Sequence, residues 1–198
     1  IWETAAAQLP DAPFAKQGSR TVTWSEAERR AEGLATFLLD RGAQRQDKVA
    51  QYLYNCPEYL ESVFACYKAA LVPVNTNYRY AADELVYLWD NADAVAVIFH
   101  GIFADTIEAI RARVPRVATW LWVDDGSGDD LLPGAVDYEE ALAAADPEPT
   151  LPDWRADDFY VVYTGGTTGA PKGVLWRQAD FLVAALGIRR PDGTDVES

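Results

Sequence analysis

The sequence predicts a layered α/β domain built around a mainly parallel sheet. Short apolar runs alternate along the chain with segments in which apolar residues recur at helical spacing, the order expected of strands joined by crossover helices. The run Ala94 to Phe99 is almost wholly apolar, which is typical of a strand covered on both faces of a parallel sheet. With 198 residues, 49% of them hydrophobic, the chain can bury a sizeable core.

Helices are predicted where apolar residues recur every three or four positions. Ser25 followed by Glu28 is a capping-box pattern, and the spacing after it predicts a helix from Glu26 to Arg41. Pro57 suits the first position of a second helix. The same pattern predicts four more helices: Ala82 to Asn91, Phe103 to Arg113, a helix capped by Asp137 that runs to Ala145, and one near Gln178 to Ile188.

Strands are predicted from short apolar runs rich in β-branched and aromatic residues. They are Lys48 to Tyr54, Val72 to Asn75, Ala94 to Phe99, Thr119 to Val123, Phe159 to Tyr163 and Val174 to Trp176. Three prolines fall within Asp146 to Pro152, which is the best linker candidate. We therefore expect a first α/β subdomain over residues 1–150, and an incomplete second one over residues 151–198.

Composition excludes some classes of protein. The formal charge of −14 argues against a nucleic-acid-binding surface. No apolar run reaches the roughly 18 residues that would span a membrane, and no signal peptide opens the chain, so we expect a cytoplasmic protein.

Both ends look cut, and an open sheet edge would favour homo-oligomers or self-association. Cys56 and Cys66 lack metal-ligand or redox spacing and are expected to be reduced packing residues.

The most informative segment is the loop from Thr164 to Gly173, which follows a predicted strand and precedes another. It holds four glycines, three threonines and Lys172. Glycine-rich backbone can turn several N–H groups into one hollow that holds anions, and a lysine adds a mobile charge suited to phosphate. The loop has neither the Walker A pattern nor a following helix, as a dinucleotide fingerprint would require. It predicts a polyphosphate site, with a flexible hairpin of incidental composition as the alternative.

Other candidates favour structural roles. His100, the only histidine, ends a strand with no visible partner, and we interpret it as structural or exposed. Asp157 and Asp158 could hold a metal, although a solvated lead-in to the strand is favoured. The acidic pairs Asp124–Asp125 and Asp129–Asp130 lack EF-hand spacing and indicate a solvated loop.

The string from Thr164 to Gly173, preceded by Tyr163, resembles the phosphate-binding signature of the adenylate-forming enzymes, which include acyl-CoA synthetases, peptide-synthetase adenylation domains and luciferases. Gly165 stands where many members have serine. The segment Tyr67 to Asn75 is similar to another core segment of the family, with Ala70 in place of a usual glycine. Two further segments fall where the family has similar ones, Thr23 to Glu26 and Glu84 to Leu88.

The resemblance implies the N-terminal part of the large domain of such an enzyme, ending after the phosphate-loop hairpin. It also implies a two-step reaction: a carboxylate attacks the α-phosphorus of ATP, and coenzyme A then takes the acyl group from the acyl-adenylate. Thr164 would contact Mg²⁺ and Lys172 would counter the charge of the leaving pyrophosphate. The remaining implied ATP ligands are the backbone N–H groups of Gly165, Gly166 and Gly169 and the hydroxyls of Thr167 and Thr168.

The family's other catalytic groups follow this loop, so the resemblance assigns no catalytic residue here, and we expect the fragment alone to be inactive. Gly165 and the segment Val174 to Gln178 look like those of fatty-acyl or steroid side-chain CoA synthetases of actinobacterial type. Gln178 stands where the family often has a histidine, which removes one substrate-side contact. Two alternatives remain: an adenylation domain that loads a carrier protein, and a non-catalytic nucleotide-binding or interaction module.

Overall fold

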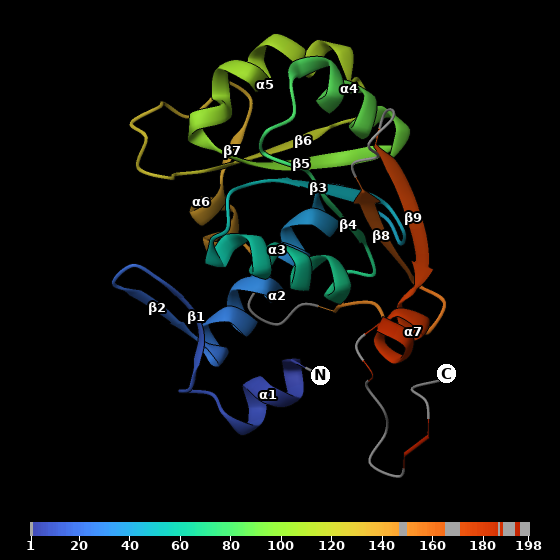
Figure 1. Ribbon diagram of the computed structural model, residues 1–198. Helices are drawn as coiled ribbons and strands as arrows, with labels where there is room; N and C mark the ends of the chain where they lie inside the picture. The colour runs from blue at the N-terminus through green and yellow to red at the C-terminus, as the bar shows by residue number, and fades with distance from the viewer. Residues whose placement is uncertain (1, 147–149, 165–170, 186, 188–192, 195–198) are drawn as a thin grey trace.

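Seven strands form one sheet in the order β7-β6-β5-β3-β4-β8-β9 (Figure 1). The computed structural model describes residues 2–146, 150–164, 171–185, 187 and 193–194. Six strands are parallel, and β9 pairs antiparallel with β8. The strand bounds are β3 Lys48–Tyr52, β4 Val72–Asn75, β5 Ala94–His100, β6 Thr119–Val123, β7 Val136–Asp137, β8 Phe159–Thr164 and β9 Lys172–Arg177.

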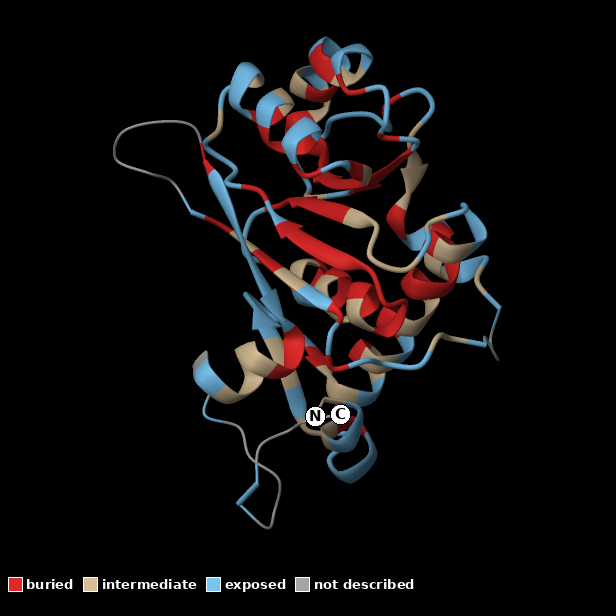
Figure 2. Ribbon diagram, turned by 90° about the vertical axis from the view of Figure 1, so that its right-hand side faces the viewer, coloured by how far each residue is buried: buried red, intermediate tan, exposed pale blue. Residues whose placement is uncertain are grey.

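Helices cover both faces of the sheet. One apolar cluster joins the sheet to α2 (Trp24–Asp40), α3 (Pro57–Lys68) and α6 (Tyr138–Ala143), and another joins its opposite face to α4 (Ala82–Asn91) and α5 (Ala104–Ile110). Figure 2 shows the central strands as buried between these layers. The mainly parallel α/β fold predicted from the alternating pattern is confirmed.

Smaller elements complete the chain. Single 3₁₀ turns, Gly101–Phe103 and Arg111–Arg113, flank α5, and α7 (Gln178–Asp180) continues into a π-helical turn over Phe181–Ala185. The helix predicted to reach Ile188 is therefore described only as far as these turns. At the other end lie helix α1 (Trp2–Gln8) and the antiparallel hairpin of β1 (Pro13–Gln17) and β2 (Arg20–Thr23).

The N-terminus of α2 differs from the prediction. Thr23, and not Ser25, caps the helix: the Glu26 N–H donates to the Thr23 hydroxyl over 3.2 Å, and the helix begins at Trp24. Capping needs an extended residue whose side chain reaches the first turn. Thr23 meets this condition because it ends β2 with ψ of 166°.

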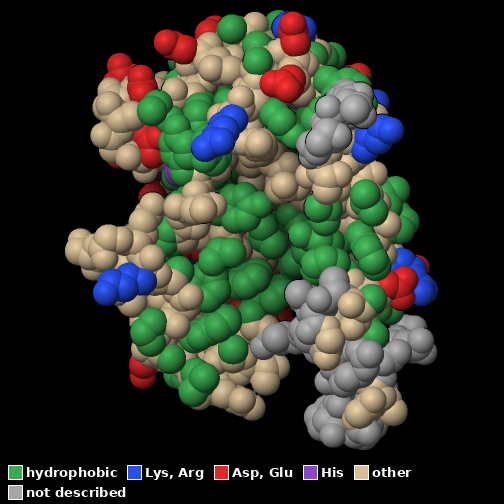
Figure 3. All heavy atoms as spheres, in the orientation of Figure 1, with side chains coloured by type: hydrophobic (Ala, Val, Ile, Leu, Met, Phe, Trp, Pro, Cys, Tyr) green, Lys and Arg blue, Asp and Glu red, His purple; other side chains and the backbone are tan. Residues whose placement is uncertain are grey.

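The strand β9 forms an apolar outer edge of the sheet. Its six residues are all exposed, and they include Val174, Leu175 and Trp176. Leu60 on α3 is also exposed, and Figure 3 shows hydrophobic side chains gathered over the middle of this face. Self-association through this edge remains a prediction.

Candidate functional site

The hairpin of β8 and β9 frames the predicted phosphate loop. The two strands are paired from Phe159 opposite Arg177 to Thr164 opposite Lys172, so both ends of the loop are held in register. Thr164 and Lys172 are exposed, which leaves the hydroxyl and the ammonium free to meet a solvent-borne ligand. The strand–loop–strand setting inferred from the sequence is confirmed. The other predicted phosphate ligands, Gly165, Gly166, Thr167, Thr168 and Gly169, lie outside the described residues.

The tip of the hairpin is fixed by Tyr163. Its hydroxyl donates to Asn91 Oδ1 of α4 over 2.9 Å, and its backbone N–H donates to Asn75 Oδ1 at the end of β4 over 3.3 Å. The ring lies over Gly173, where an added Cβ would stand 2.9 Å from Tyr163 Cζ. Burial raises the pKa of Tyr163, so the hydroxyl stays protonated and remains a donor. We call Tyr163, Asn75 and Asn91 the tip latch.

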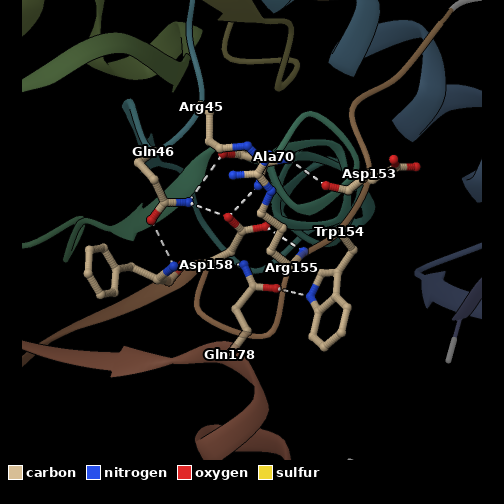
Figure 4. Close-up of polar contacts among 9 residues, drawn as sticks. Arg45, Gln46, Ala70, Asp153, Trp154, Arg155, Asp158 and Gln178 are labelled. Atoms are coloured by element: carbon tan, nitrogen blue, oxygen red, sulfur yellow. Dashed lines mark hydrogen bonds and ion pairs between the residues drawn. The ribbon is translucent and has the colours of Figure 1, made fainter. Parts of the chain in front are cut away.

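The base of the hairpin is fixed by Asp158 (Figure 4). Its Oδ1 accepts from Arg45 Nη1 over 2.5 Å and from Gln46 Nε2 over 3.1 Å. The solvated lead-in predicted for Asp157 and Asp158 is wrong for Asp158, which is 3% exposed, whereas Asp157 is exposed. A buried carboxylate requires a partner of opposite charge, and Arg45 provides it. We call Arg45, Gln46 and Asp158 the base clamp.

Gln178 closes the base from the β9 side. Its backbone N–H donates to the Asp158 carbonyl over 2.8 Å, and its side-chain oxygen accepts from Trp154 Nε1 over 2.7 Å. Its amide nitrogen donates to the Phe159 carbonyl over 3.3 Å. The side chain is 7% exposed. These bonds give the Gln178 side chain a structural role, and the loss of a substrate-side contact inferred from the sequence remains a prediction.

The structural reading of His100 is confirmed. Its Nδ1 accepts the Tyr54 backbone N–H over 3.0 Å, and it is 4% exposed, because β5 carries it into the core and not to the surface. Burial lowers its pKa, which favours the neutral ring that can accept this bond. Cys56 and Cys66 are free, buried thiols whose pKa values burial raises.

Two classes of feature are absent from the described part of the chain. No group of three or more histidine, cysteine and carboxylate side chains there could hold a metal ion. Within the same residues, every helix is too short or too polar to cross a bilayer.

A second hollow was missed by the sequence reasoning. A cavity of about 390 Å³ lies at the carboxyl ends of β3, β5 and β6, and its lining includes Tyr54, His100 and Asp125. After β3 the chain crosses to β4 on one side of β3, and it then returns to β5 on the other side of β3. The carboxyl ends of β3 and β5 therefore mark a topological switch point of the sheet. Only the strand order reveals it, because its lining comes from loops far apart in sequence.

The model of the AMP-binding enzyme family matches residues 2–196. The chain belongs to the AMP-binding enzyme family. Among curated relatives, it is 38% identical to the medium-chain acyl-CoA ligase Mig of Mycobacterium avium over 96% of this chain and 37% of that protein. It is 40% identical to a 3-oxocholest-4-en-26-oate–CoA ligase of Rhodococcus rhodochrous over 90% of this chain and 32% of the relative.

Solved structures agree in fold. The acetoacetyl-CoA synthetase of Streptomyces lividans superposes with a TM-score of 0.82 at 25% identity, covering 93% of this chain and 31% of that one. An anthranilate CoA ligase in complex with anthranoyl-AMP gives a TM-score of 0.85 at 20% identity over 93% of this chain and 35% of its own, which shows the fold alone. The chain thus spans about a third of the length of the relatives that it matches.

Proposed function

We propose that this chain is the N-terminal portion of an ATP-dependent acyl-CoA ligase. The parent enzyme would join a fatty or related lipid acid to AMP and pass the acyl group to coenzyme A. The names of the relatives support the reaction class, since they are ligases of medium-chain acids and of a steroid acid. The observation that carries the proposal is the hairpin, which holds Thr164 and Lys172 as registered partners on either side of the glycine- and threonine-rich loop.

The proposed chemistry needs charge stabilisation more than covalent help. Attack on the α-phosphorus expels pyrophosphate, so the protein must hold the β- and γ-phosphates in line and balance their charge. Lys172, at the first position of β9, would supply the positive charge. The hydroxyl of Thr164 is an oxygen ligand of the kind that Mg²⁺ prefers, and its exposed position at the end of β8 fits that role. Gly165, Gly166, Thr167, Thr168 and Gly169 would add backbone and hydroxyl donors.

We also propose that residues 151–198 begin a second subdomain. After α6 the chain passes from β7, at one edge of the sheet, to β8, beside β4 near the other edge. Pairing changes there from parallel to antiparallel. This crossing supports the boundary near residue 150, although β8 and β9 belong to the same sheet as the strands before them.

Two measurements test the proposal. MgATP binding to this chain, followed by calorimetry, should weaken about tenfold in Lys172→Gln, because one charge-assisted contact is lost. Lys16→Gln removes another exposed lysine, from β1, and should bind like the wild type. Pyrophosphate release with ATP and a panel of fatty acids should be absent from this chain and present in the longer parent protein. Equal MgATP affinity in both lysine variants would contradict the proposal, and turnover by this chain would contradict the expectation that the fragment alone is inactive.

A further inference from the structure

The phosphate hairpin is joined to the rest of the sheet by very little strand pairing. The β4–β8 ladder contains a single registered pair, Val74 with Val161, whereas β3 and β5 share five and β8 and β9 share six. A single registered pair constrains the register and direction of β8 against β4 less than a longer ladder would. Other contacts must therefore set the orientation of β8 and β9.

Amide side chains accept hydrogen bonds from the backbone at both ends of β8, where no registered pair with β4 is present. The Phe159 N–H donates to Gln46 Oε1 over 2.8 Å, and the Tyr163 N–H donates to Asn75 Oδ1 over 3.3 Å. One acceptor, Gln46, lies just before β3, and the other, Asn75, is the last residue of β4. The backbone of β8 is thus tied down by side chains at each end, with the one registered pair between them.

The base clamp holds backbone that is otherwise unfavourable. Gln46 has φ of 69° and Ala70 has φ of 54°, and the Gln46 N–H donates to the Ala70 carbonyl over 2.8 Å. Residues with a Cβ avoid this left-handed region, and such conformations persist only where the surroundings hold them. Here Asp158 holds the Gln46 side chain, and Arg45 also donates to the Asp153 carbonyl over 2.5 Å. Gln46, whose backbone is in the left-handed region, is thus itself a member of the base clamp.

We infer that the base clamp and the tip latch are positioning residues for the phosphate site, and that they set where Thr164 and Lys172 stand. This inference rests on the proposed function. Tyr163 immediately precedes Thr164, and Gly173 immediately follows Lys172, so the latch acts next to both ends of the loop. The clamp acts at the other end of the hairpin, where it fixes the direction of the strands. No residue of the latch or the clamp is among the phosphate ligands proposed above.

The test uses exposed latch residues, whose replacement leaves the core intact. Asn75→Ala removes the acceptor of the Tyr163 N–H, and Asn91→Ala removes the acceptor of its hydroxyl. Asn77→Ala is the matched control, because Asn77 is exposed just after β4 and its Oδ1 also accepts a backbone N–H, that of Arg79 over 3.0 Å. Asn91→Asp keeps an acceptor oxygen and serves as the conservative rescue. Asp158→Asn tests the clamp.

Each variant is measured for MgATP affinity by calorimetry, and for amide hydrogen exchange in β8 and β9 relative to β3 and β5. We expect Asn75→Ala and Asn91→Ala each to raise the Kd for MgATP roughly fivefold, the equivalent of one net hydrogen bond. Hairpin amides should exchange faster while β3 and β5 stay protected. Asn77→Ala and Asn91→Asp should match the wild type, and Asp158→Asn should show the largest loss of hairpin protection.

The outcomes separate the inference from the function on which it rests. A wild-type chain that fails to bind MgATP refutes the proposed function and takes the inference with it. A wild-type chain that binds MgATP, with latch and clamp variants that bind as tightly as Asn77→Ala, overturns the inference alone. If Asp158→Asn fails to fold, the two latch variants decide the result.

Discussion

Replacing Gly173 with alanine tests how closely the hairpin tip is packed. A Cβ at this position would stand 2.9 Å from Cζ, 3.1 Å from Cε2 and 3.2 Å from the hydroxyl oxygen of Tyr163. Carbon atoms in favourable contact lie about 3.5–4.0 Å apart. The ring must therefore shift, and its hydrogen bond to Asn91 is the first contact to be lost.

The loss of stability in Gly173→Ala has two sources, overpacking at the Tyr163 ring and a lost hydrogen bond. Overpacking a buried site costs about 1–3 kcal/mol, and Tyr163 is 8% exposed. A lost hydrogen bond adds about 1 kcal/mol. Part of the strain is relieved because β9 lies at the sheet edge and can move. We expect Gly173→Ala to lower the free energy of unfolding by about 2 kcal/mol, which is about 4–8 °C in Tm for a chain of this length.

Urea unfolding followed by near-ultraviolet circular dichroism measures this loss. Gly33→Ala is the control, since its Cβ would meet the Leu142 carbonyl oxygen at 3.4 Å, an ordinary contact, and alanine favours a helix by about 1 kcal/mol over glycine. In a Tyr163→Ala background the penalty of Gly173→Ala should disappear. An unchanged midpoint in the single variant, or the same loss in both backgrounds, would refute the packing argument.

Three further changes test other parts of the fold by urea unfolding. Ala70→Gly should raise the free energy of unfolding by up to about 1 kcal/mol, because φ of 54° disfavours a Cβ; a loss of stability would contradict this. Burial holds the pKa of His100 below its usual 6.5, so the neutral ring contributes stability above pH 6.5. This stability is lost as the pH falls toward the folded-state pKa. His100→Gln should therefore make the free energy of unfolding decline less on the acid side, and an unaltered pH profile would contradict this prediction. Tyr138→Phe should lower stability by about 1–2 kcal/mol, because the buried Glu61 loses the hydroxyl that donates to its Oε2 over 3.1 Å; a neutral result would show that Arg30 alone satisfies the carboxylate.

The parallel core was predictable because its residues carry the pattern themselves. Strands such as β4 and β6 and the helix α4 have the bounds that their apolar runs indicate. The hairpin at Thr164 to Lys172 was predictable for the same reason, since glycines and a proline separate two apolar runs.

What the sequence concealed depends on partners far along the chain. Asp158 is buried because Arg45 reaches it from 113 positions away, and no local pattern records that distance. Helix α1 is missed for a similar reason, because Trp2 stacks on Phe64 of α3 with ring centroids 4.2 Å apart. The β1–β2 hairpin lacks alternation, since every residue of β1 is exposed or half-buried.

The central claim is that the ends of the β8–β9 hairpin meet the phosphates of ATP. Titration of the ¹⁵N-labelled chain with MgATP, followed by amide chemical shifts, tests it most directly. We predict the largest shifts at Thr164, Lys172 and Gly173, with the β6 amides unshifted. Shifts gathered instead around Tyr54, His100 and Asp125, at the switch-point cavity, or no shifts at all, would contradict it.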